Sequence, residues 1–399
     1  MDLHSGAAFW LLSNGLVESP PPFSGRDACD VLIVGAGITG ALLADALSAD
    51  GSDVIVLDRR EPGLGSTAAS TALLLFDTDV ELTELAERIG ESDAARVYQL
   101  GIDAIGTIAR LCQELGNCAF VRRPSLYLAS RRLHRRRLQQ EAKLRERHRL
   151  PSTYLSKSEL ASRYPFRAHG ALHSEVAAEV DPLRLTRALL TRASGRGCRV
   201  YARTALRSYQ DQPAGIRAVT DRGGEIQARR VVFAIGYEVP NHLRRELVTL
   251  TSTYVLATHI VDDWDGWTDR CLVWESARPY SYLRTSEDNR ILVGGADVRF
   301  KDAATRDRLM PGRIRKLERR LRKMVPAIET ATAFSWGGTF GETEDGLPYI
   351  GGIEESPGAL FALGYGGNGI TFGAIAAGIL RDVCVGRTHP DAQLFRFDR

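Results

Sequence analysis

The pattern of apolar and polar positions divides the chain into unlike regions. An almost entirely apolar run at residues 30–34, a glycine turn, a helix from about residue 38 and a second apolar run at 54–57 predict a βαβ unit. Strands that are apolar on both faces are typical of a parallel sheet covered on both sides. A Pro-rich connector precedes this unit at residues 18–28.

The middle of the chain alternates helical and strand patterns. From about residue 80 the period is helical, and a densely basic stretch at 130–150 predicts a solvated helix rather than a nucleic-acid helix, because no aromatics are interleaved for stacking. Residues 313–324 predict another solvated helix with an apolar stripe. Further strands are predicted at 198–210, 215–221 and 226–236.

The block from Thr251 to Asp297 alternates apolar and polar residues and predicts an antiparallel sheet. Together these patterns indicate an α/β fold: a Rossmann-like domain with a parallel sheet, plus an α+β second domain with an antiparallel sheet and flanking helices. A length of 399 residues favours two joined domains.

Composition excludes several classes of function. A net charge of +3 gives no reason to expect a nucleic-acid partner, and no apolar run is long enough to span a membrane. Six cysteines without a C-x-x-C pair argue against a zinc or disulfide framework, so no metal and a reduced, cytoplasmic location are expected. The apolar stretch Ala7–Leu12 lacks a preceding basic residue, and we expect an N-terminal arm that packs Phe9 and Trp10 onto the body.

The first glycine motif has the context of a dinucleotide site. Gly35, Gly37 and Gly40 follow a strand and open a helix, and Asp58 ends the next strand. These glycines allow a tight turn, close approach to a pyrophosphate and helix packing, while the carboxylate can bind ribose hydroxyls. Asp58 disfavours a 2′-phosphate, but the motif does not choose between NAD and FAD.

A second match, Gly364, Gly366 and Gly369, lies near the C-terminus in GYGGNGIT. Only thirty residues follow Gly369, and they hold no apolar strand closed by an acid, so no second βαβ unit fits. The remaining features are a strand at 360–363, a glycine turn and a bare helix N-terminus at about Ile370. Such a terminus can stabilise the charge that a flavin ring gains on reduction.

Five segments in order resemble the FAD-dependent D-amino-acid oxidase superfamily: DVLIVGAGITG, GSTAAST, RRVVFAIG, WGGTFGETEDGLPYIG and GYGGNGIT. Glycine oxidase, sarcosine oxidase and γ-glutamylputrescine oxidase are members. The resemblance implies an FAD-binding domain assembled from residues 27–85, 176–240 and 334–399. A substrate domain of residues 86–175 and 241–333 is inserted between these segments, and residues 1–26 form the arm.

The resemblance also implies roles for individual residues. The cofactor-binding residues are expected to be Gly35, Gly37, Ile38, Thr39, Gly40, Asp58, Arg59, Ser66, Thr67, Ser70, Thr71, Leu206, Gly236, Gly366, Gly367, Asn368, Gly369, Ile370 and Thr371. Members of the family oxidise a carbon–nitrogen bond by hydride transfer to flavin N5, and the resulting imine hydrolyses.

The sequence departs from the family at the substrate anchor. Phe340 stands where members that act on small α-amino acids place an arginine that binds the carboxylate. Either Arg278 or Arg284 replaces that arginine, or the substrate is an amine without an α-carboxylate. Tyr280, Tyr282, Arg284, Phe340 and Tyr365 are the predicted substrate-pocket residues.

Two further positions concern the flavin. Leu292 stands where sarcosine-oxidase-like members place a lysine that promotes reaction with dioxygen, so an oxidase and a dehydrogenase remain alternatives. No cysteine lies between Cys271 and Cys384, so FAD is expected to bind noncovalently.

The sequence therefore predicts an FAD-dependent oxidoreductase that oxidises a small-molecule amine or amino acid, with dioxygen or another acceptor reoxidising the flavin. An NAD-dependent dehydrogenase and a flavin-bearing, non-catalytic subunit of a larger complex are the alternatives. A homo-oligomer is left open, as is the identity of the substrate.

Overall fold

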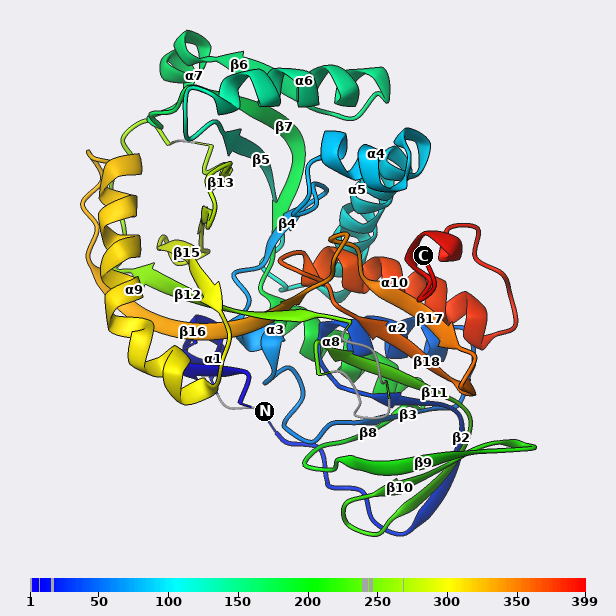
Figure 1. Cartoon of the computed structure of the whole chain (residues 1–399). Coiled ribbons are helices and arrows are strands. Elements are labelled where there is room, and N and C mark those ends of the chain that lie inside the picture. Colours follow the sequence, from blue (N-terminus) through cyan, green and yellow to red (C-terminus); the bar gives the residue numbers. More distant parts are fainter. Residues whose placement is uncertain (1, 7, 16–17, 239–242, 244–246, 268) are drawn as a thin grey trace.

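The computed structural model describes residues 2–6, 8–15, 18–238, 243, 247–267 and 269–399 (Figure 1). Within these residues the strands form one sheet of eight strands and one of ten. Ala7, in the predicted arm, and the predicted boundary between residues 240 and 241 lie outside the described residues.

The eight-stranded sheet contains the predicted dinucleotide unit. Its strands are β2 (Arg26–Val34), β3 (Val54–Leu57), β8 (Arg199–Tyr201), β9 (Leu206–Gln212), β10 (Gly215–Thr220), β11 (Glu225–Gly236), β17 (Tyr349–Ile353) and β18 (Ser356–Leu363). Along the order β18-β11-β2-β3-β8 all neighbours are parallel. The predicted parallel sheet is therefore confirmed.

The other strands form the ten-stranded sheet. They are β1 (His4–Gly6), β4 (Leu73–Leu75), β5 (Val121–Leu128), β6 (Thr153–Ser156), β7 (Gly170–Glu179), β12 (Thr249–Thr258), β13 (Leu272–Glu275), β14 (Ser281–Thr285), β15 (Ile291–Arg299) and β16 (Thr332–Glu342). Pairing is antiparallel except between β13 and β5. Strands β4 and β16 belong to this sheet although they lie in the segments assigned to FAD binding.

Helices cover the sheets. They are α1 (Phe9–Asn14), α2 (Ile38–Ala49), α3 (Ser66–Ala69), α4 (Leu82–Ile89), α5 (Glu91–Leu115), α6 (His134–Arg147), α7 (Lys157–Arg163), α8 (Pro182–Gly195), α9 (Ala303–Met324), α10 (Gly369–Cys384) and the 3₁₀ helix Ala392–Phe395. Helix α2 packs between α8 and α10 on one face of the parallel sheet. Strands β9 and β10 extend from the far end of that sheet (Figure 1). No helix in the described residues is long and apolar enough to cross a membrane.

The predicted solvated helices differ from the structure in one respect. Helix α9 places Ile314, Leu317 and Leu321 in the core, as the stripe predicts. Helix α6, however, buries Glu141 and Arg145 completely, because each is the ion-pair partner of the other. The prediction that this helix is simply a solvated one is therefore wrong for its inner face.

The N-terminal arm docks as expected and also adds a strand. Phe9 and Trp10 are buried, and β1 pairs with β16 at the edge of the ten-stranded sheet. The Trp10 indole Nε1 donates to the Ser70 carbonyl oxygen at 2.6 Å. The arm thus holds the segment after α3 in place.

Candidate active site

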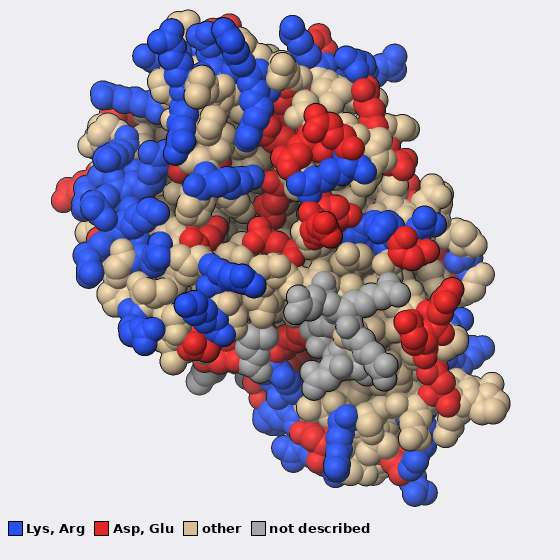
Figure 2. All heavy atoms as spheres, in the orientation of Figure 1, with Lys and Arg blue, Asp and Glu red and all other residues tan. Residues whose placement is uncertain are grey.

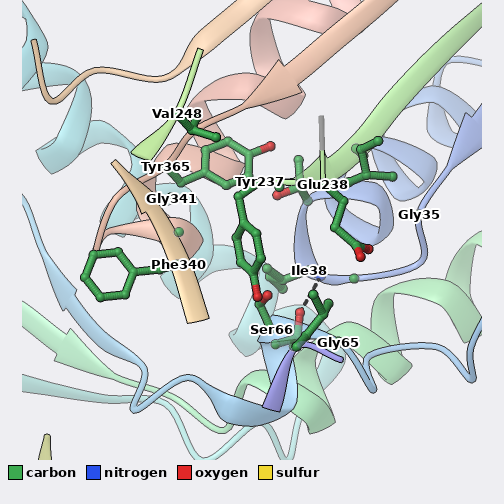
Figure 3. Close-up of a pocket in the computed structure, with 18 of the residues that line it drawn as sticks. Gly35, Ile38, Gly65, Ser66, Tyr237, Glu238, Val248, Phe340, Gly341 and Tyr365 are labelled. Atoms are coloured by element: carbon green, nitrogen blue, oxygen red, sulfur yellow. Dashed lines mark hydrogen bonds between the residues drawn. The ribbon is translucent and has the colours of Figure 1, made fainter. Parts of the chain in front are cut away.

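A cavity of about 1540 Å³ lies between the two sheets. Its lining includes both glycine turns, one from each end of the chain. Figure 3 shows the rings of Phe340 and Tyr365 in one part of this cavity and the Tyr237 ring pointing toward Ser66, near Ile38. The two turns therefore serve one site.

The first glycine turn has the tight geometry that its sequence predicts. Gly35 adopts φ +111°, and a Cβ atom there would overlap the carbonyl oxygen of Ala234 on β11. A Cβ atom on Gly40 would overlap the Gly35 carbonyl oxygen, so only glycine lets α2 start this close to β2. Gly40 itself is buried by this contact and does not line the cavity, whereas Gly37 does.

The carboxylate of Asp58 closes this turn. Its Oδ2 accepts a hydrogen bond from the Ala36 N–H at 2.7 Å, and its Oδ1 accepts one from the Arg60 N–H at 2.8 Å. Burial raises the pKa of Asp58, and the two N–H donors partly offset that rise. Asp58 lines the cavity, with Arg59 next to it in the sequence, and Arg59 is paired with Glu238.

The segment around α3 forms the next part of the lining. The Thr67 hydroxyl accepts a hydrogen bond from the Ile38 N–H at 3.0 Å, which joins α3 to the start of α2 (Figure 3). The Trp336 indole donates to the Ala69 carbonyl oxygen at 2.9 Å from the side of β16. The other predicted residues of this region that line the cavity are Ser66, Ser70, Thr71, Thr39, Leu206 and Gly236.

The second glycine turn lies opposite. Gly366, Gly367, Asn368, Gly369 and Ile370 all line the cavity. Asn368 is the N-cap of α10, yet its side chain makes no capping hydrogen bond, so N–H groups at this helix start keep their capacity to donate. Thr371 does not line the cavity: it is buried, and its hydroxyl donates to the Leu75 carbonyl oxygen at 3.3 Å.

Sequence reasoning missed Asp79, which connects three segments of the site. Its Oδ2 accepts from the Gly367 N–H at 2.6 Å, and its Oδ1 accepts from the Tyr280 hydroxyl at 3.0 Å. The Arg278 guanidinium donates to the Asp79 carbonyl oxygen at 2.8 Å and lies 4.8 Å from the Tyr280 ring centroid. No sequence motif marks Asp79, because its partners come from distant parts of the chain.

The predicted substrate residues divide into two groups. Tyr280, Tyr282, Phe340 and Tyr365 line the cavity. Arg284 does not line it: the side chain is 2% exposed, and Nη1 donates to the carbonyl oxygens of Thr71, Ala72 and Val180 at 2.9–3.1 Å. The prediction that Arg284 faces the substrate is therefore wrong, because backbone carbonyls and Glu179 satisfy its guanidinium.

Other lining residues were not predicted. Asp297 on β15, Thr253 on β12 and Trp274 on β13 face the cavity from the ten-stranded sheet, and Tyr237 follows β11. Asp297 is a lone acid after the apolar strand pattern ILVGGA, but this pattern does not say whether the acid is solvated or faces a cavity. Leu292, in contrast, is fully buried in the core and does not line the cavity.

Comparison with known proteins decides the family. A family model described as FAD dependent oxidoreductase matches residues 30–383. The chain belongs to this FAD-dependent oxidoreductase family.

Relatives in this family match the chain along most of their own length. A glycine oxidase of Bacillus licheniformis is 24% identical over 370 residues, which cover 90% of this chain and 94% of that protein. The γ-glutamylputrescine oxidoreductase of Escherichia coli is 24% identical and covers 92% and 85%. A crystal structure of glycine oxidase from Geobacillus kaustophilus superposes with a TM-score of 0.76 at 21% identity, covering 92% and 96%. These structural matches confirm the two-domain fold.

The residues of this family member fit FAD. Glycines form the cradle at both turns: a Cβ atom on Gly37 would come within 3.2 Å of the Thr67 hydroxyl, and one on Gly366 within 2.5 Å of Asp79. The carboxylate of Asp58, after β3, and the N-terminus of α2 suit the ribose and phosphates of a nucleotide. The N-terminus of α10 suits an electron-rich ring. The alternative of an NAD-dependent dehydrogenase is not supported, since the family is FAD-dependent.

Proposed function

We propose that this FAD-dependent oxidoreductase oxidises a carbon–nitrogen bond of a small amine or amino acid. The observation that carries the proposal is that one cavity joins a nucleotide-type turn, a helix N-terminus without a side-chain cap and a wall of tyrosines. Relatives named for glycine, γ-glutamylputrescine and amino-acid substrates support the same class of reaction. FAD, bound noncovalently, would supply the hydride acceptor.

The protein's own residues would hold and orient the reactants. Gly35, Gly37 and the start of α2 would bind the pyrophosphate, and Asp58 the ribose hydroxyls. The N–H groups at the start of α10 would stabilise negative charge on the ring, because a helix N-terminus carries a partial positive charge. Tyr280, Tyr282 and Phe340 would form the apolar walls that exclude water from the substrate.

Phe340 favours an amine over an α-amino acid. It lies on β16 and faces the cavity, so no guanidinium projects from this position. Arg284, one of the two candidate replacements, is committed to backbone carbonyls and Glu179. Arg278 is exposed and does not line the cavity in the described part of the chain.

A visible spectrum and an anaerobic titration test the proposal. The purified protein should carry flavin absorption bands, and a primary or secondary amine should bleach them without air. Repeating the assay in air with peroxide detection separates an oxidase from a dehydrogenase. Absence of flavin bands after reconstitution with FAD, or no bleaching by any of a broad panel of amines and amino acids, would refute the proposed reaction.

A further inference from the structure

The charges that line the cavity are distributed unevenly. The part lined by the eight-stranded sheet is mixed in charge: Arg59, Arg60 and Arg207 line it together with Asp58, Asp211, Glu238 and Glu355. The part lined by the ten-stranded sheet and the segment after β4 contains Asp77, Asp79 and Asp297, and no lysine or arginine among the described residues lines it. The Arg278 guanidinium lies next to this part, against the Tyr280 ring, but is exposed. A carboxylate-bearing substrate would meet repulsion there, whereas a cation would be attracted.

Of these three acids, only Asp297 has a buried carboxylate oxygen without a hydrogen bond of good geometry among the described residues. Asp77 is ion-paired with Arg145, and Asp79 accepts from Gly367 and Tyr280. The Oδ1 atom of Asp297 is buried and has no hydrogen bond of good geometry among the described residues. The Thr253 hydroxyl on the neighbouring strand β12 lies close enough to lower the pKa of Asp297, but it makes no hydrogen bond of good geometry either. Buried polar atoms rarely remain without a partner, so this pair points to a ligand.

Aromatic residues lie near the carboxylate of Asp297, whose charge acts on both Tyr280 and Tyr282. The ring centroid of Tyr280 lies 5.7 Å from that of Tyr282 and 6.5 Å from that of Trp274. Gly294 makes room for Tyr282, because a Cβ atom there would overlap the phenol ring. Aromatic faces next to a carboxylate attract organic ammonium groups.

We propose that Asp297 binds the ammonium group of the substrate and takes its proton, and that the substrate is an alkylamine or arylalkylamine without an α-carboxylate. One N–H bond of the ammonium breaks and one O–H bond forms at Asp297, which leaves a neutral amine with a free lone pair. Only that neutral form can lose a hydride from the adjacent carbon. The inference rests on the proposed function and specifies its substrate class.

The electrostatics of the site agree with a proton acceptor. Burial raises the pKa of Asp297 to about 7, the nearby negative charges of Glu342 and Asp79 add to that rise, and Thr253 and Arg278 oppose it. A base with a pKa near the working pH is the most effective proton acceptor. Tyr280 and Tyr282 also face this carboxylate, and burial raises the pKa of both, so they stay neutral through this range. Figure 2 shows acidic side chains gathered over the region of β4 and the loop between β16 and β17, while basic side chains cover α6 and α9.

The test measures binding rather than turnover. The FAD-loaded protein is titrated without air with n-butylammonium, n-butanol and butyrate, and the flavin spectrum and the melting temperature are recorded. We expect n-butylammonium alone to bind, with an affinity that rises between pH 6 and 8 as Asp297 ionises. Asp297→Asn should weaken this binding about 30-fold or more and remove its pH dependence.

Glu342→Gln is the matched control, because the charge of Glu342 acts on Asp297 although Glu342 does not line the cavity. It should change the affinity less than about threefold. Equal binding by Asp297→Asn and the unaltered protein would overturn the inference, as would tighter binding of butyrate. If Asp297→Asn yields no holoprotein, the pH dependence of the unaltered protein decides. Bleaching by α-amino acids that is indifferent to Asp297 would leave the proposed function standing and reject the inference alone.

Discussion

Arg145 offers a quantitative test of how the cavity wall is held. This fully buried guanidinium donates from Nε to Glu141 at 2.8 Å and pairs through Nη1 with Asp77, which lines the cavity. Glu141 in turn accepts the backbone N–H groups of Leu82 and Thr83 at the start of α4, each at 2.9 Å. The cluster therefore fixes both ends of the segment that contains Asp79.

Replacing Arg145 by methionine keeps most of the volume and removes the charge. Two buried carboxylates would then face each other without compensation, a change that costs about 3–5 kcal/mol. With an unfolding entropy of about 2.1 cal/mol/K per residue over 399 residues, the melting temperature should fall by roughly 4–6 °C.

The pH dependence of this loss identifies its cause. Burial alone would raise the pKa of Glu141, but the charge of Arg145 and two backbone N–H groups hold it below its usual value. Such a depressed pKa stabilises the fold above the carboxyl's unfolded pKa, and this contribution is lost as the pH falls through the folded value. Without Arg145 the carboxyl can protonate, so the deficit of Arg145→Met should be larger at pH 7 than at pH 5.

Differential scanning calorimetry at the two pH values measures both effects. Arg147→Met is the control on the same helix, since Arg147 is 65% exposed and pairs with Glu91 at the surface. That change should cost less than about 1 kcal/mol. A deficit for Arg145→Met no larger than the control's, or one that is equal at both pH values, would refute the reasoning.

Three further changes test the rest of the site. Gly40→Ala should abolish or weaken FAD binding at least tenfold, measured by flavin absorbance after reconstitution, because its Cβ would overlap the Gly35 carbonyl oxygen; full flavin occupancy would contradict this packing role. Phe340→Arg should shift the ratio of bleaching rates from amines toward α-amino acids by about tenfold, the effect of roughly one charge-assisted hydrogen bond, and an unchanged ratio would show that Phe340 is misplaced. Arg284→Met should lower the melting temperature, since it leaves the buried carbonyl oxygens of Thr71, Ala72 and Val180 without their guanidinium donor, and should keep the substrate preference; a changed preference in a fully stable protein would argue against its structural role.

The sequence predicted most accurately the parts of the site that depend on local rules. The βαβ unit has its second strand at Val54–Leu57 and its helix starting at Ile38, as predicted, because apolar runs and a glycine turn specify both. The burial of Arg284 away from the cavity could not be predicted in this way. Alternation along a strand says that Tyr282 and Arg284 share a face, but the two-residue step between them, about 7 Å, takes the chain from the cavity into the core.

The placement of Asp297 and Asp79 beside the cavity could not be predicted from the sequence pattern either. Whether a lone acid on a strand is solvated or buried beside a cavity depends on the neighbouring strands, and these come from residues 249–258 and 281–285. Periodicity describes one strand at a time, so it carries no information on which rings surround a carboxylate. The acidic character of this part of the cavity wall therefore became visible only once the sheet was assembled.

The arrangement of the sheet explains why both ends of the chain line one cavity. Strands β2 and β18, which carry the two glycine turns, flank β11, and all three run parallel, so their carboxyl ends lie at one edge of the sheet. A crevice at that edge is where open α/β sheets bind their ligands. Helices α2 and α10 start from these turns and pack against each other so closely that a Cβ atom on Gly373 would come within 2.8 Å of the Thr39 hydroxyl. Two positive helix ends therefore converge on one cavity, and the second turn completes the site that the first begins.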